Sequence, residues 1–244
     1  MTATISPDAG TSVDRETGSS LAGSALVSAV LFAVSLVIGV IFAGSPYSSP
    51  FGDDAALQAF YTDHATLLQW VAFCQFGSAI ALAVFTAVLV ARLRKVAPGF
   101  PALTYTAAAG GVMAALFLGL NSVVQWSMSH PSVIELAPVR RALHYLFFGL
   151  GGFAHVASIG VLVGAVSVIA LRARLLPGWL IVASLVVAVL ALASPLTFVT
   201  ESTTLLIPLG RFPALLWQVA VAFMLPVVAR SSVGSASHRT LSGP

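Results

Sequence analysis

Six long stretches of apolar residues dominate this 244-residue chain, and almost no charged residue falls inside them. A helix needs about 20 apolar residues to cross the hydrocarbon layer of a bilayer. Apolar residues make up 58% of the chain and charged residues only 8%, too few charges for the surface of a soluble domain. The sequence therefore predicts an all-α membrane protein. Its bundle of six transmembrane helices is expected at roughly 22–43, 67–91, 101–128, 144–171, 178–197 and 212–229.

The two ends of the chain lack this apolar pattern. Residues 1–20 are rich in Ser, Thr and Gly and carry several charges, and residues 231–244 are also polar. Such a composition favours disorder, so we expect a disordered tail at each end and one transmembrane domain over residues 21–230. The first apolar run is too long for the core of a secretory signal, and we expect it to be retained as a helix.

The basic residues predict how the chain is oriented in the membrane. Lys and Arg accumulate in short cytoplasmic loops, and a cytoplasmic N-terminus places eight of the eleven basic residues on that side. These eight are Arg15, Arg92, Arg94, Lys95, Arg172, Arg174, Arg230 and Arg239. We therefore expect both termini to be cytoplasmic. Because the basic residues are divided among short loops, they do not form a surface that would bind nucleic acid.

Two basic turns that lie 80 residues apart suggest an internal repeat. Residues 92–100 read RLRKVAPGF and residues 172–180 read RARLLPGWL. The same offset aligns Gln75 with His155. If helices two and three repeat as helices four and five, the repeat is of a parallel type found in some transporters, and we expect these two side chains at equal depth. A chance similarity between two apolar spans that end in Arg-x-Arg explains the alignment equally well.

The polar side chains within the spans gather in the outer half of the predicted bundle. At a rise of about 1.5 Å per residue, His155 and Gln75 lie roughly 15 Å from the outer boundary, and four other amides lie nearer to it. Polar groups at this depth turn away from lipid, so we expect an interior polar pocket that opens to the outer side. The predicted ligand-binding residues are His155, Gln75, Asn121, Gln125 and Gln218. Hydrogen bonds that merely hold helices together account for the same pattern.

Further polar residues are predicted at the outer rim. His64, His130 and His144 lie near helix ends, and imidazole with a nearby carboxylate suits zinc or copper. They are candidate metal ligands, although chance placement at helix ends explains them too. Residues 53–61 predict a short amphipathic helix that begins at an Asp, either a lid or a connector. Arg211 is expected at the exposed outer end of the last helix.

Two short motifs carry a resemblance to a known family. Residues 176–180 read LPGWL at the start of the fifth helix, and residues 210–213 read GRFP before Trp217 in the sixth. With six helices over residues 20–230, the chain resembles an uncharacterised family of six-span bacterial integral membrane proteins, a domain of unknown function. The resemblance implies a location in the bacterial plasma membrane and supplies no catalytic residues.

These patterns predict a membrane protein that binds or transports a small or amphipathic molecule in its outward-facing polar pocket. No span contains Asp or Glu and no nucleotide-binding motif is present, which argues against active transport. One alternative is a membrane-embedded enzyme that uses His155 as an acid or base on a lipid-like substrate. Another is an accessory or sensory subunit that has no ligand and contacts membrane lipids and a membrane-protein partner. The sequence does not identify a cofactor.

Overall fold

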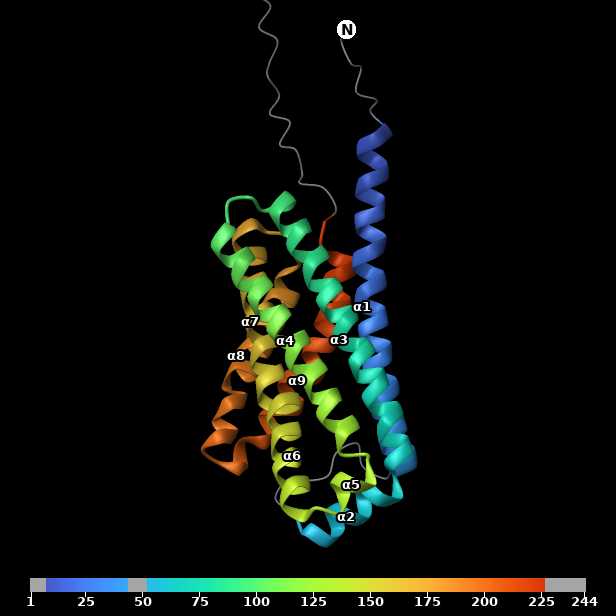
Figure 1. The fold of residues 1–244 in the computed structure, drawn as a ribbon. Coiled ribbons are helices and arrows are strands. Elements are labelled where there is room, and N and C mark those ends of the chain that lie inside the picture. Colours follow the sequence, from blue (N-terminus) through green and yellow to red (C-terminus); the bar gives the residue numbers. More distant parts are fainter. Residues whose placement is uncertain (1–7, 44–51, 227–244) are drawn as a thin grey trace, which may run out of the picture.

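The computed structural model describes residues 8–43 and 52–226, and most of these residues are helical (Figure 1). Within these ranges, six helical segments are long and apolar enough to cross a membrane. The first lies within α1 (Asp8–Ala43), and the next three are α3 (Ala65–Val96), α4 (Pro101–Ser127), and α6 (Ala137–Gly149) continued by α7 (His155–Ala173). The fifth is α8 (Gly178–Ala193) with the 3-10 helix that follows it, and the sixth is α9 (Leu206–Met224) with the 3-10 helix that precedes it. The described residues contain no strand, so the predicted all-α bundle of six membrane-spanning helices is confirmed.

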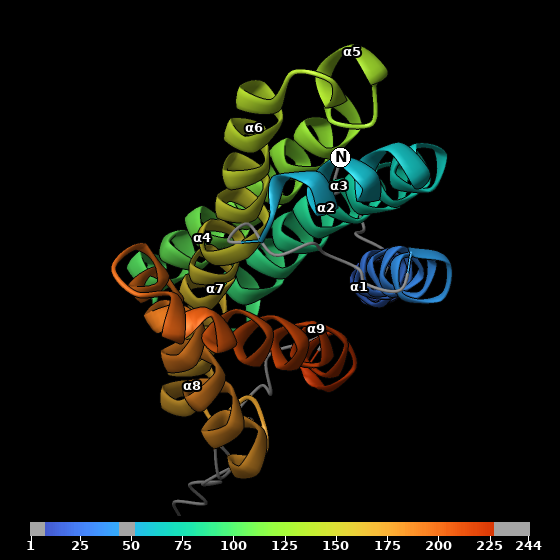
Figure 2. The same cartoon turned by 90° about the horizontal axis from the view of Figure 1, so that it is seen from below.

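Consecutive spans pack side by side, as short connections between antiparallel helices favour. α1 lies along α3, α3 along α4, α4 along α7, α7 along α8, and α8 along α9. α9 also contacts α1 and α7, so the last helix returns to the first, as Figure 2 shows from the end of the bundle. The centre of the bundle is therefore bordered by α1, α3, α4, α7 and α9.

The half of the bundle that ends in the basic turns has an apolar core. Phe85 and Leu89 from α3 pack in one cluster with Leu162 and Val166 from α7, and all four side chains are completely buried. α4 approaches α7 closely through Gly110, where an added Cβ atom would lie 2.6 Å from the backbone nitrogen of Leu162. Close packing of this kind is how membrane helices associate, because lipid supplies no hydrophobic drive between them.

The first helix is longer than predicted. α1 begins at Asp8, so residues 8–20, which were predicted to be a disordered tail, are helical. α1 extends beyond the other helices at the end of the bundle where α9 finishes (Figure 1). Both ends of the described chain lie on this side, in agreement with an even number of spans. Residues 1–7 and the predicted tail at 231–244 lie outside the described residues.

Short helices form a cap at the opposite end of the bundle (Figure 1). They are α2 (Asp54–Asp63) and α5 (Pro131–Ile134). α2 begins where the Asp53 carboxylate accepts hydrogen bonds from the backbone N–H groups of Ala55 and Ala56, at 3.2 and 3.3 Å. This contact satisfies N–H groups that have no partner within the helix. The short helix that the sequence predicted after Asp53 is therefore confirmed.

The fourth span is interrupted in its middle. Leu150–Ala154 form a π-helical turn between α6 and α7, and Gly152 within it has a ψ angle of −107°. Such turns inside α-helices occur frequently at functional sites. The neighbouring Gly151 allows close contact with α4, because an added Cβ would lie 2.4 Å from Oδ1 of Asn121. The single helix predicted over 144–171 is thus two helices, and His155 is the first residue of the second.

The sixth span begins earlier than predicted. Two 3-10 helices, Ser194–Phe198 and Glu201–Leu205, lead into α9, which starts at Leu206 and not at 212. Proline is common in the first turn of a helix, and Pro213 suggests a start at 212. In the structure Pro213 lies inside α9. Arg211 consequently lies in the second turn of a helix, which corrects the prediction that it belongs to the exposed outer end.

Candidate functional site

His155 points into the bundle and only 4% of its surface is exposed. Its Nδ1 atom lies 2.8 Å from the backbone carbonyl oxygen of Ala114 on α4. A carbonyl oxygen can only accept a hydrogen bond, so Nδ1 carries the proton and donates. In the neutral ring Nε2 is then an acceptor, and it is the nitrogen that remains for a ligand.

A small cavity of about 20 Å³ borders His155. Residues of α1, α3, α4, α7 and α9 line it. Its polar lining residues are Ser28, Ser78, His155, Arg211 and Gln218, and none of the described residues in its lining is acidic. Space of this size holds about one water molecule. The structure therefore places a small donor-rich cavity at the centre of the bundle.

Arg211 supplies the positive charge beside this cavity. Its side chain is half-buried, and its Cζ atom lies 5.7 Å from the centroid of the Phe32 ring on α1, within the range of a cation–π interaction. A charged side chain within a membrane span is costly unless it faces a polar interior. Arg211 meets this requirement by turning toward the cavity.

Gln218 and two serines add hydrogen-bonding groups to the same lining. Gln218 is almost completely buried, and its Nε2 has no hydrogen-bond partner among the described residues. The Ser78 hydroxyl donates to the backbone oxygen of Ser28 at 2.8 Å, which joins α3 to α1. A buried donor without a partner costs about 1–3 kcal/mol. An acceptor brought into the cavity would remove that cost at Gln218.

Gln75 and Asn121 form a separate pair. Nδ2 of Asn121 donates to Oε1 of Gln75 at 3.0 Å, and both side chains are buried. Neither residue lines the cavity beside His155. Gln125, one turn from Asn121 on α4, is also buried outside that cavity, and its Oε1 has no partner within the described ranges. Of the four amides predicted to share a pocket with His155, the structure brings only Gln218 to the cavity.

The contacts on α4 show that Gln75 and His155 differ in depth. Gln75 contacts Asn121 and His155 contacts Ala114. These two positions are seven residues apart, or about 10 Å along a helix, with Asn121 nearer the capped end. The equal depth predicted from the internal repeat therefore does not hold. α3 also runs unbroken through Gln75, whereas a π-helical turn precedes His155.

The three histidines near the capped end, His64, His130 and His144, each use Nδ1 in a hydrogen bond. The bonds are His64 to the oxygen of Phe60 at 3.0 Å, His130 to the oxygen of Trp126 at 2.9 Å, and His144 to the hydroxyl of Tyr61 at 3.0 Å. In the part of the chain that the structure describes, no three metal-ligating side chains lie together. Each of these histidines is thus held separately, by a contact with the cap or with the end of a helix.

Comparisons with models of protein families, with curated protein sequences and with solved structures find no match for this chain. The function of the cavity is therefore inferred from its geometry.

The sequence pointed to His155 and Gln218 but missed Arg211 and the serine pair. Arg211 and Gln218 are seven residues apart, which is two helical turns, so they share one face of α9. If the helix had been predicted to start before Arg211, the face that Arg211 shares with Gln218 would have been apparent from the sequence. Ser28 and Ser78 carried no such signal, because serine is common in membrane helices and its role depends on which helix lies opposite.

Proposed function

We propose that this integral membrane protein binds the carboxyl group of a small or amphipathic molecule in the cavity bordered by His155, Arg211 and Gln218. One observation carries the proposal. A guanidinium group, a buried amide donor and an imidazole meet in a single cavity whose described lining residues include no carboxylate. A carboxylate ligand would bring a negative charge and hydrogen-bond acceptors to these groups.

The chemistry of a carboxyl group matches these three side chains. Arginine presents parallel N–H donors that suit the two oxygens of a carboxylate, and the Nε2 of Gln218 adds a further donor. Nε2 of His155 accepts the proton of a carboxylic acid, or donates to a carboxylate once it is protonated. In both cases the ligand and the imidazole share one proton.

The dimensions of the cavity restrict what is buried. About 20 Å³ is room for about one water-sized group, so an oxygen of the carboxyl group is the part that enters. Phe32 of α1 and Leu215 of α9 supply apolar lining beside it, and an alkyl tail would contact these side chains. An acid with an alkyl tail gains this contact in addition to the polar one, so we expect amphipathic acids to bind more tightly than acetate.

Thermal stabilisation of the purified protein tests this proposal. A ligand at 100 times its Kd stabilises the folded state by about 2.7 kcal/mol. We expect octanoate to raise the melting temperature in detergent, acetate to raise it less, and octanamide, which has no acidic group, to leave it unchanged. Arg211→Gln and His155→Leu should abolish the shift. Arg94→Gln, at a basic turn away from the cavity, is the matched control and should keep it.

An equal shift with octanamide, or a full octanoate shift in Arg211→Gln, would contradict the proposal. If His155→Leu does not fold, His155→Gln replaces it, because the amide can retain the hydrogen bond to Ala114. The absence of any shift with the acids would leave the polar groups as contacts between helices, and would favour an accessory membrane subunit.

A further inference from the structure

A second and larger hollow lies on the lipid-facing side of the bundle, between α3 and α4. Its volume is about 460 Å³, within the range of small-molecule binding sites. Its walls are the aromatic side chains of Trp70, Phe73, Phe76 and Trp126, and small residues, Ala72 and Ser122, lie between them. This hollow, named here the α3–α4 groove, shares no lining residue with the cavity beside His155.

The α3–α4 groove runs from the capped end of the bundle toward its middle. Gln69 lies in the second turn of α3 and Phe76 lies seven residues further along, about 10 Å deeper at the rise of a helix. Trp70 and Trp126 stand near the outer ends of their helices. Tryptophan is enriched where a membrane meets water. The groove therefore begins at the interface and ends in the hydrocarbon layer.

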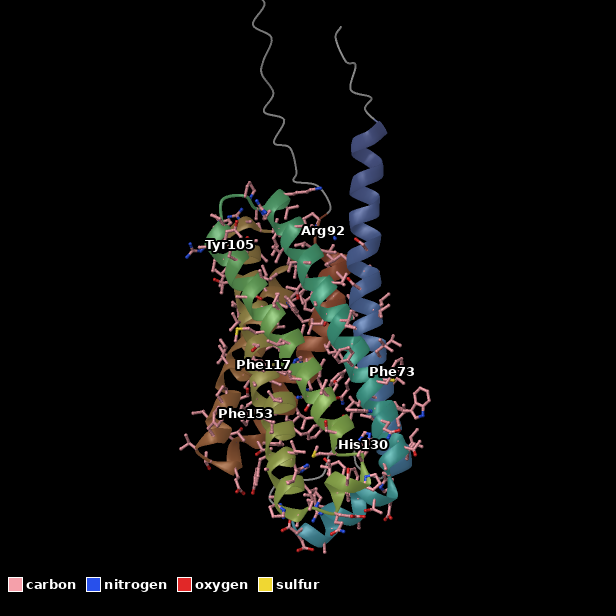
Figure 3. The ribbon with its side chains drawn as sticks, viewed as in Figure 1. Phe73, Arg92, Tyr105, Phe117, His130 and Phe153 are labelled. Carbon is pink, nitrogen blue, oxygen red and sulfur yellow. The ribbon has the colours of Figure 1, made fainter. Side chains whose placement is uncertain are left out.

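Contacts between aromatic rings fix the orientation of side chains that line the groove. Trp70 meets Phe73 edge to face with ring centroids 6.0 Å apart, and Trp126 meets His130 in the same way at 4.6 Å. Figure 3 labels Phe73 on α3 and His130 just beyond the end of α4. More than half of the surface of Trp70, Phe73 and Trp126 remains exposed. Walls that are already ordered reduce the entropy cost of binding.

The low polarity of the groove restricts which kind of molecule can bind there. No charged residue is among the described residues that line it. The Ser122 hydroxyl donates to the backbone oxygen of Leu118 at 2.8 Å, so the floor offers little to a polar ligand. Gln69 is exposed at the outer end. A matching molecule is apolar along most of its length and has an uncharged hydrogen-bonding group at the interface.

We propose that the α3–α4 groove binds one acyl chain of an outer-leaflet phospholipid, with Gln69 hydrogen-bonded to the ester region. The groove opens onto the bilayer, and a phospholipid places an ester at the interface with a chain directly below it. Hydrocarbon chains gain no hydrophobic drive inside a membrane. Retention of the acyl chain in the groove depends on dispersion contacts between its methylene groups and the aromatic side chains that line the groove.

Photolabelling tests this site. The full chain is placed in nanodiscs of phosphatidylcholine and phosphatidylglycerol that contain a trace of phosphatidylcholine with a diazirine in one acyl chain. We expect severalfold more adducts on residues 69–76 and 122–126 than on Val182 and Val189, which face outward on α8. The double variant Phe73→Ala with Phe76→Ala should lower labelling of the groove to the level of α8. Phe223→Ala, at an exposed ring on α9, is the matched control and should change nothing.

Equal labelling of the groove and of α8, or unchanged labelling in the double variant, would overturn the proposal and leave ordinary contact with surrounding lipid. Cross-links from α3 to a second copy of the chain in place of lipid would overturn it as well. If the double variant does not fold, Ser122→Leu tests the same point by filling the floor, and its groove labelling should fall while that of α8 stays.

Discussion

The hydroxyl oxygen of Tyr61 lies 3.0 Å from Nδ1 of His144, and both side chains are almost completely buried. Their rings also meet edge to face at 5.9 Å. Tyr61 belongs to α2 and His144 to α6, so this contact fastens the cap to the fourth span. Beside it Arg141 forms an ion pair with Asp54 at 2.6 Å. The cap is therefore held over the end of the bundle by specific contacts, one of them buried.

The stability that Tyr61 contributes should depend on alkaline pH. Burial raises the pKa of the Tyr61 phenol above its ordinary value of 10.0. The unfolded chain then loses this proton at a lower pH than the folded protein. The stabilisation is complete below pH 10 and is lost as pH rises further. We expect the melting temperature of the wild type to fall as the pH rises above about 10, and that of Tyr61→Phe to fall less.

At neutral pH the same Tyr61→Phe variant should be less stable than the wild type by about 1 kcal/mol, because it loses one buried hydrogen bond. Tyr105→Phe is the matched control, since the Tyr105 ring is exposed. Identical pH profiles for the wild type and Tyr61→Phe would show that the phenol of Tyr61 is accessible and that the cap is not closed at this point.

Substitution of Gly151 should disturb the π-helical turn. A Cβ atom at this position would lie 2.4 Å from Oδ1 of Asn121, so Gly151→Ala must displace α6 and α7 from α4 or break the pair of Asn121 with Gln75. Overpacking of this kind costs about 1–3 kcal/mol, measured as a lower free energy of unfolding in mixed micelles.

The control for this variant is Gly178→Ala, because an added Cβ at Gly178 has no neighbour within 4 Å. Asn121→Ala combined with Gly151→Ala should recover part of the loss, since the shorter side chain makes room for the new methyl group. Equal stability of Gly151→Ala and the wild type would mean that this contact is not close.

Reporter fusions should reveal the orientation of the bundle. The predicted topology assigns eight of the eleven basic residues to the segments on the side of the N-terminus, and such residues mark cytoplasmic segments. A reporter fused after Pro244 should therefore behave as cytoplasmic, and one inserted near Asp54 as external. Alkaline phosphatase and a fluorescent protein give opposite signals on the two sides. The reverse pattern at both positions would place the cap in the cytoplasm.

Part of the candidate site was predictable because depth in a membrane follows from counting residues along a span. His155 and Gln218 were identified as interior polar groups, and the structure buries both at the cavity. Arg211 was placed at the outer end because the last helix was expected to start at 212, whereas α9 starts at Leu206. Gln75 was expected at the cavity, yet it pairs with Asn121. Counting gives depth along one helix, but it does not say which helix lies opposite.

The sequence by itself determined the six spans, the short helix after Asp53 and the concentration of polar groups toward one end, because each depends on apolar runs or on local capping that involves neighbouring residues only. Tertiary structure alone decided that Gln75 meets Asn121, that Tyr61 reaches His144 across 83 residues, and that Arg211 faces Phe32. Helix rotation and packing set these contacts, and they depend on the side chains of several helices at once. For the same reason Gly151 could be recognised as a point of close approach only after α4 was seen against it.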